Sequence, residues 1–330
     1  LFAHNGSLDL LPYFFTAEDF CAAHSEKGIL CGPGRGSAGG VLISYLLGIT
    51  HVNPLKHNLS LDRFLTLDRI KSGKMPDIDT DFADRDWLFE DDGYLEKRFK
   101  GKYAQIATVA MMKLKSSIKD VFRQKYKEVP YNIMKFAESL PDEPQGIPTY
   151  DFVFGYEDTD KNHVQGLIEK SAELRQFTKN YPLEWEAIVR CLGVTRSRGV
   201  HASAVAIIDQ EINGLIPLTT QKEGKEAKVV TQYTMSGVEQ VGALKFDFLG
   251  LSTLKDIQGA IKLIQERNSN IMPKGDHLFL NNLKVPMMRI LPYKGELYDI
   301  WDLPYVKEVY DDIGEGRTET VFQLNTPTAQ

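Results

Sequence analysis

The stretch Met75-Pro76-Asp77-Ile78-Asp79-Thr80-Asp81-Phe82 carries three carboxylates at two-residue spacing and decides the fold prediction. Successive side chains of a β-strand point to opposite faces, so the three acids share one face and the intervening residues share the other. Like charges gathered on one face are costly unless a cation offsets them. We therefore expect a strand with an apolar back face that presents Asp77 and Asp79 to hard divalent cations.

Two other interpretations of the acidic stretch need to be weighed. A calcium loop of the EF-hand type also begins with alternating acids, but it requires Gly at its sixth position and Glu at its twelfth. Phe82 and Leu88 stand at those positions, which excludes a calcium loop. A solvated acidic edge strand is the structural alternative, although Ile78 and Phe82 favour a buried face behind the acids.

Composition is that of an ordinary globular protein. The 330 residues are 42% hydrophobic and 25% charged, and this length allows two or three domains. The longest apolar run, near 41–49, is too short to span a bilayer, so we expect no membrane association. Three widely spaced cysteines without a C-x-x-C pair predict no zinc site and favour a reducing, cytoplasmic compartment. The start without Met and the abrupt end suggest a fragment of a longer chain.

The net charge of −6 taken alone argues against nucleic-acid binding. It does not decide the matter, because the basic residues are concentrated in one part of the chain and a local basic face can bind phosphates. Between 97 and 127, ten Lys or Arg residues stand against one acid. We expect a helix over 106–127, on which Lys115, Lys119 and Arg123 recur every four residues and form a basic stripe. Such a stripe is either a solvated face or a face that follows the phosphates of a nucleic acid.

A glycine-rich segment spans 32–40, between a short apolar stretch and a predicted buried helix at 41–48. A loop of this kind places backbone N–H groups where anions bind, and Arg35 would suit a triphosphate. Its G-x-G-x-x-G spacing also matches the dinucleotide-binding fingerprint, so a Rossmann dehydrogenase has to be considered. No second strand ending in an acid follows at the required distance, which weakens that alternative. A merely structural glycine turn stays open.

Asp247 is an isolated acid in an otherwise apolar predicted strand. An unpaired buried carboxylate is costly, so this side chain requires a cation or a hydrogen-bond partner. Lys245 lies two residues earlier on the same strand face and could be a structural partner. The functional alternative is that Asp247 completes the metal site of Asp77 and Asp79. A second buried strand is expected at 199–208, with His201 as a hydrogen-bonded structural residue.

Four motifs in this order resemble the family C replicative DNA polymerases of bacteria, the DNA polymerase III alpha subunits. The resemblance covers essentially the whole chain and rests on GPGRGSAGG at 32–40, MPDIDTDF at 75–82, GVHASAVAI at 199–207 and KFDFLGL at 245–251. The chain departs from the family pattern at Ser203-Ala204, where the family usually has two glycines, and at Asn325, where it usually has Glu.

The resemblance implies an α+β fold with a palm like that of the polymerase-beta nucleotidyltransferase superfamily, a mixed sheet backed by helices. A helical thumb is inserted into this palm. The implied domains are the first part of the palm at 1–108, the thumb at 109–200, the second part of the palm at 201–255 and a truncated start of the fingers at 256–330.

The resemblance also implies the roles of individual residues. Asp77, Asp79 and Asp247 would be catalytic and hold two Mg²⁺ ions, with Mn²⁺ as a substitute, and Asp81 would be structural or support the site. The residues implied to bind the nucleotide are Arg35, Gly36, Ser37, Arg63, Arg69 and Lys245. The residues implied to lie nearest the primer–template DNA are Lys115, Lys119 and Arg123.

The implied activity is DNA-templated DNA synthesis from dNTPs on primer–template DNA, in bacterial or phage replication. A sliding clamp and other replisome subunits would be partners of the full-length parent. Because most of the fingers is absent, the activity of the isolated fragment stays open. Two alternatives remain: a template-independent nucleotidyltransferase, and a non-catalytic DNA-binding relic of a polymerase palm and thumb.

Overall fold

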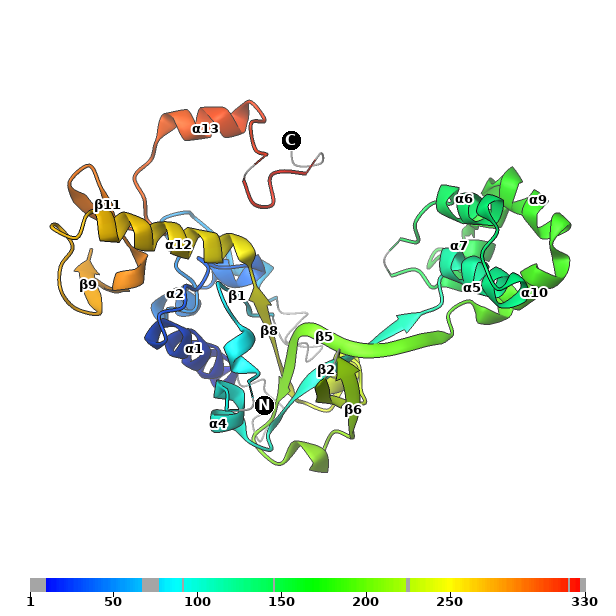
Figure 1. Ribbon diagram of the computed structural model, residues 1–330, viewed down its shortest axis with the longest axis horizontal. Coiled ribbons are helices and arrows are strands. Elements are labelled where there is room, and N and C mark those ends of the chain that lie inside the picture. Colours follow the sequence, from blue (N-terminus) through cyan, green and yellow to red (C-terminus); the bar gives the residue numbers. More distant parts are fainter. Residues whose placement is uncertain are drawn as a thin grey trace. The chain divides into compact units, whose positions relative to one another are not determined.

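The computed structural model describes residues 10–66, 77–90, 92–144, 146–223, 226–319 and 321–326 (Figure 1). The α-helices are α1 Leu11–Glu26, α2 Leu42–Leu46, α4 Tyr94–Phe99, α5 Leu114–Tyr126, α6 Tyr131–Ser139, α7 Thr149–Phe154, α8 Leu167–Lys170, α9 Ala172–Asn180, α10 Pro182–Cys191, α11 Met235–Gln240, α12 Ser252–Arg267 and α13 Lys307–Gly314. The strands are β1 Asp79–Phe82, β2 Tyr103–Met111, β3 Gly155–Glu157, β4 His163–Gln165, β5 Thr195–Ile207, β6 Leu218–Glu223, β7 Glu226–Thr231, β8 Leu244–Gly250, β9 His277–Leu280, β10 Leu283–Pro286, β11 Ile290–Tyr293 and β12 Glu296–Asp299.

The chain folds into two compact units. The first comprises Leu1–Ile106, His201–Thr220 and Val229–Gln330, and the second comprises Ala107–Val200 and Gln221–Lys228. The second unit is therefore largely one continuous segment between two parts of the first. Among the described residues, no helix is long and apolar enough to cross a membrane.

The largest sheet has six strands in the order β1-β8-β5-β2-β7-β6. Strands β1 and β8 are parallel, whereas β5 runs antiparallel to β8, so the sheet is mixed. The pairing sets Asp79 opposite Asp247, and Ala204 of β5 lies opposite Asp247 on the other side. This register brings two acids that are far apart in the sequence onto neighbouring strands.

An aromatic core in the first unit lies behind the acidic strand. Phe20 of α1 is fully buried, and its ring centroid lies 4.4 Å from that of Phe248 and 5.7 Å from that of Phe246, both on β8. Ile78 and Phe82 are buried, while Asp79 and Asp81 alternate with buried neighbours along β1. The predicted two-faced strand is thus confirmed over Asp79–Phe82, whereas Asp77 lies just before it. Strand β1 is also an edge strand of the sheet, and its back face is buried in the aromatic core.

The core of the second unit is built from α5, α6, α9 and α10. Ile118 and Phe122 of α5 are buried together with Phe177 of α9 and Ile188 of α10. The ring of Phe177 stacks on that of Phe136 with a centroid distance of 4.5 Å. The apolar stripe of α5 therefore faces this core, and its basic residues occupy the remaining surface.

Two expectations about secondary structure were wrong, and two hairpins were not predicted. The helix expected over 106–127 is strand β2 followed by α5, because β-branched residues such as Ile106 and Val109 suit a pleated sheet. The helix expected over 41–48 is the short α2, and its Leu46 is exposed rather than buried. Beyond α12 the chain forms the hairpins β9–β10 and β11–β12, for which the sequence analysis predicted no strands.

Candidate active site

Strands β1 and β8 carry the acidic residues that the sequence singled out. Asp79 and Asp247 are register partners on these parallel strands, and Asp77 comes just before β1. Tyr13 of α1 links the segment before β1 to β8. Its hydroxyl accepts a hydrogen bond from the N–H of Ile78 (3.0 Å) and donates one to the carbonyl of Lys245 (3.2 Å). The aromatic side chain therefore holds the start of β1 beside β8.

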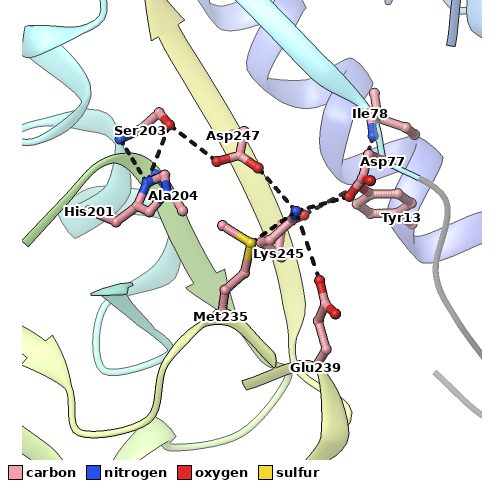
Figure 2. A network of polar contacts seen from close by, with 10 residues as sticks. All are labelled: Tyr13, Asp77, Ile78, His201, Ser203, Ala204, Met235, Glu239, Lys245 and Asp247. Carbon is pink, nitrogen blue, oxygen red and sulfur yellow. Dashed lines mark hydrogen bonds and ion pairs between the residues drawn. The ribbon is translucent and has the colours of Figure 1, made fainter. Parts of the chain in front are cut away.

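The ammonium group of Lys245 lies among the carboxylates (Figure 2). Its Nζ is 2.9 Å from Asp77 Oδ1, 3.2 Å from Asp247 Oδ2 and 3.8 Å from Glu239 Oε1. The Lys245 and Asp247 side chains are each 12% exposed. Burial alone would lower the pKa of Lys245, but the hydrogen bond to Asp77 and the charge of Asp247 outweigh it and raise that pKa. Lys245 is therefore permanently charged, and it bridges Asp77, just before β1, and Asp247 of β8.

For Asp79, burial and the neighbouring carboxylates change the pKa in the same direction. Burial raises the pKa of the Asp79 carboxyl, and the charges of Asp247 and Asp77 raise it further. The positive charges of Lys245 and Arg35 only partly oppose this effect. The ionised form of Asp79 is therefore disfavoured, first by burial and then by the two neighbouring carboxylates.

Asp81, the third acid of the stretch, binds Arg35. The Arg35 Nη1 atom donates a hydrogen bond to Asp81 Oδ1 at 3.2 Å. Burial raises the pKa of Asp81, and the charge of Arg35 works against that rise. The pair thus ties the glycine-rich segment to β1, so that Arg35 is held by an acid next to the cluster of Asp77, Asp79 and Asp247.

The glycine-rich segment is irregular rather than a strand–loop–helix unit. Cys31 forms only an isolated bridge with Phe82, and 36–40 is a 3₁₀ helix that leads into α2. Gly36 has a φ of +57°, and a side chain there would begin 3.7 Å from Asp79 Oδ2. Ser37 follows in the 3₁₀ helix and is half-buried. A Rossmann unit is excluded, since within residues 10–35 no strand precedes the glycines and β8 pairs with an antiparallel neighbour.

Replacing Gly34 with Ala is expected to lower the free energy of unfolding by about 1–3 kcal/mol. Gly34 has a φ of +140°, and an added Cβ would meet Thr50 at 3.3 Å. Gly39→Ala is the matched control, because nothing lies within 4 Å of a Cβ there, and its effect should stay within about 0.5 kcal/mol. Urea unfolding of the chain measures both values. Equal stability of the two variants would show that the loop geometry is wrong.

Strand β5 contributes Ser203 to the acidic cluster, and His201 of the same strand lies beside Ser203 (Figure 2). The Ser203 hydroxyl donates a hydrogen bond to Asp247 Oδ1 at 3.2 Å. His201 Nδ1 accepts hydrogen bonds from the N–H groups of Ser203 (3.2 Å) and Ala204 (3.0 Å). His201 therefore has the hydrogen-bonded structural role expected from the sequence. No sequence signal placed Ser203 beside Asp247, Glu239 beside Lys245 or Tyr13 against Ile78 and Lys245, because each contact depends on tertiary structure.

The remaining sequence-predicted residues lie elsewhere or outside the described part of the chain. Arg63 ends a 3₁₀ helix that begins at Leu61, and Arg69 lies outside the described residues. The three basic residues of α5 belong to the other unit, and each pairs with an acid. These pairs are Lys115 with Asp142 (2.7 Å), Lys119 with Glu138 (3.1 Å) and Arg123 with Asp120 (2.7 Å).

The acids fit a divalent metal by donor type and charge. Three carboxylates on adjoining segments provide the hard oxygen ligands that Mg²⁺ and Mn²⁺ prefer, and the strand register sets Asp79 opposite Asp247. Within the described residues, however, no three His, Cys, Asp or Glu side chains are grouped so that they could hold a metal ion as they stand. Lys245 lies between Asp77 and Asp247, so a metal would require this ammonium group to move.

Comparison with known proteins places the chain in a family. Residues 7–250 match the family described as Bacterial DNA polymerase III alpha NTPase domain. A protein of Aquifex aeolicus named DNA polymerase III subunit alpha is 33% identical, over 95% of this chain and 25% of that protein. Proteins of the same name from Campylobacter jejuni and Bacillus subtilis are each 34% identical, over 95% and 78% of this chain and 23% and 21% of their own lengths. The chain therefore spans about a quarter of the length of the curated relatives it matches.

Proposed function

This chain belongs to the bacterial DNA polymerase III alpha NTPase domain family, and on that premise we propose that it is part of the catalytic core of a DNA-templated DNA polymerase. The observation that carries the proposal is the register of β1 and β8, which sets Asp79 opposite Asp247 with Asp77 alongside. Nucleotidyl transfer by two metal ions requires carboxylates that converge from different segments.

The proposed domains are a palm of polymerase-beta type at 1–108 and 201–255, an inserted thumb at 109–200 and the start of the fingers from 256. The mixed sheet that carries the acids supports the palm assignment. The thumb assignment is supported by the compact helical unit that interrupts the first unit.

The chemistry needs little beyond positioning and charge. When bound among Asp77, Asp79 and Asp247, two Mg²⁺ ions, or Mn²⁺ in their place, would lower the pKa of the primer 3′-hydroxyl and neutralise the leaving pyrophosphate. The chain itself supplies the carboxylates and the cation of Lys245. A lysine ammonium group is charged at neutral pH, so Lys245 can bind phosphate oxygens when it leaves the acids.

The incoming dNTP is proposed to lie along the glycine-rich segment. The backbone of Gly36 passes beside the Asp79 carboxylate, and the absence of a side chain keeps that approach open. Arg35 is close by through its pair with Asp81. The full set proposed to bind the nucleotide is Arg35, Gly36, Ser37, Arg63, Arg69 and Lys245.

Primer–template DNA is proposed to lie along α5, with Lys115, Lys119 and Arg123 on its phosphates. Their partners Asp142 and Glu138 are 95% and 59% exposed, and exposed pairs of this kind contribute only about 0–1 kcal/mol. DNA phosphates can therefore replace these acids at little cost, with release of condensed counterions. In the full-length gene product, a sliding clamp and other replisome subunits complete the proposed set of partners.

A non-catalytic DNA-binding relic is the second candidate. One observation favours it, namely that Lys245 occupies the space between Asp77 and Asp247, so that the described residues offer no ready group of three metal ligands. Such a relic would retain the basic face of α5 and bind DNA without using its acids.

Single-nucleotide incorporation by the full-length gene product tests the proposal. Four primer–templates that differ only in the templating base are each offered one dNTP in Mg²⁺. We expect extension only where the dNTP matches the template. Extension on all four templates would indicate a template-independent nucleotidyltransferase, and DNA binding without any extension would indicate the relic.

A further inference from the structure

The two oxygens of Asp247 have different partners. Oδ1 accepts a hydrogen bond from the Ser203 hydroxyl at 3.2 Å, and Oδ2 faces the Lys245 ammonium group at 3.2 Å (Figure 2). Both Ser203 and Asp247 are almost fully buried. The carboxylate is thereby held in one orientation, with one oxygen bound to a neutral donor and the other directed toward positive charge.

His201 creates the backbone geometry that this contact needs. In a regular strand the side chains of Ser203 and Ala204 would point to opposite faces. Ala204 lies opposite Asp247 and begins the paired segment of β5 and β8, so a regular Ser203 would point away from Asp247. Instead, the N–H groups of both residues turn to His201 Nδ1, and with this local irregularity inside the continuous strand β5 the hydroxyl reaches Asp247.

The direction of each hydrogen bond follows from the donors available. His201 Nδ1 accepts two N–H groups, so it carries no proton and the ring proton is on Nε2. The Ser203 hydroxyl, which also lies 3.4 Å from Nδ1, has a single proton. A carboxylate is the stronger acceptor, and the nitrogen is already shared. The hydroxyl therefore donates to Asp247.

We propose that Ser203, held in place by the His201 ring, is a positioning residue that orients Asp247 so that Oδ2 is available to a divalent cation. The inference rests on the proposed function, because it assigns Asp247 a metal. Lys245 occupies the cation side of Asp247 in the metal-free arrangement, and Ser203 keeps Oδ1 bound whether Oδ2 faces the ammonium or the metal. Outer partners of this kind fix ligand orientation and contribute to metal affinity.

The test compares Mn²⁺ binding by the full-length gene product, measured by electron paramagnetic resonance without DNA or dNTP. Ser203→Ala is expected to weaken Mn²⁺ binding about 10–100-fold. Ser203→Thr keeps the hydroxyl and should restore most of the affinity. The matched control is Ser236→Ala, since Ser236 is an exposed serine of α11 outside the acidic cluster, and it should bind Mn²⁺ like the parent.

A second pair of variants, at His201, separates loss of the contact from misfolding. His201→Asn retains an acceptor near the place of Nδ1 and should keep much of the affinity, whereas His201→Leu should weaken binding as Ser203→Ala does. Because both act on Asp247 through one contact, the effects of His201→Leu and Ser203→Ala should not add. Additive losses would mean that the two residues act separately and would overturn the proposed coupling.

Failure of this inference can be told from failure of the proposed function. If the parent binds Mn²⁺ and Ser203→Ala binds it equally well, Ser203 is a structural residue only and the inference is wrong. If the parent binds no Mn²⁺ while Asp79→Asn behaves identically, the metal-dependent function fails and the inference fails with it.

Discussion

Asp79→Asn is expected to reduce single-nucleotide incorporation by at least about 10³-fold. The carboxylate lies opposite Asp247 on adjoining strands, and an amide cannot replace its charge as a ligand. Metal ions contribute several kcal/mol to transition-state stabilisation, and each 1.36 kcal/mol corresponds to a tenfold change in rate. Single-turnover extension by the full-length gene product in saturating dNTP measures the loss.

The same substitution is expected to stabilise the metal-free protein. Asp79 has a raised pKa in the folded state, so its ionised form opposes folding at neutral pH. This unfavourable contribution shrinks as the pH falls through the raised pKa toward the ordinary value of 3.8. Asn carries no charge and should remove both the penalty and its pH dependence. Thermal unfolding in EDTA, at neutral and mildly acidic pH, measures the difference.

Asp86→Asn is the matched control for Asp79→Asn. Asp86 lies a few residues away, and its side chain is 91% exposed, so neither the rate nor the stability should change appreciably. Incorporation at the parent's rate by Asp79→Asn would refute the catalytic role. A lower melting temperature than the parent's would refute the claim that the ionised Asp79 carboxylate opposes folding.

Lys245→Met is the second substitution with a large expected effect. It leaves the buried Asp247 without its cation beside Asp77 and Asp79, and removing one partner of a buried pair costs about 3–5 kcal/mol. Asp77 is half-exposed and should add little to this loss. We therefore expect the free energy of unfolding in EDTA to fall by about 3 kcal/mol.

Mg²⁺ should recover part of the stability lost in Lys245→Met, because a cation that binds only the folded state stabilises it. Urea unfolding in EDTA and in Mg²⁺ measures both effects. Lys255→Met, on the exposed surface of α12, is the control and should change neither value. A Lys245→Met variant as stable as the parent in EDTA would contradict the role of the ammonium group as the counterion of Asp247.

The local part of the site could be predicted from the sequence. Alternation of acids with Ile78, Thr80 and Phe82 is a property of a few adjacent residues, and the structure confirms the two faces that it predicts. The shared strand face of Lys245 and Asp247 is equally local, and the two side chains form the ion pair that was one of the two alternatives.

Long-range pairing could not be predicted from residue patterns alone. The register that sets Asp79 opposite Asp247 joins segments more than 160 positions apart. Ser203 reaches Asp247 where the N–H groups of β5 turn to the His201 ring, a local irregularity without a sequence signature. The prediction of a helix over 106–127 was wrong in its first part. The helical spacing belongs to α5 alone, and the residues before it pair as strand β2.

Diffraction from crystals soaked in Mn²⁺ and a dNTP tests the central claim most directly. We predict anomalous density between Asp77, Asp79 and Asp247, with the Lys245 ammonium group displaced toward the triphosphate and triphosphate oxygens beside Gly36 and Ser37. The same crystals with no manganese at the carboxylates, and with Lys245 still bridging Asp77 and Asp247, would contradict a metal-dependent polymerase site.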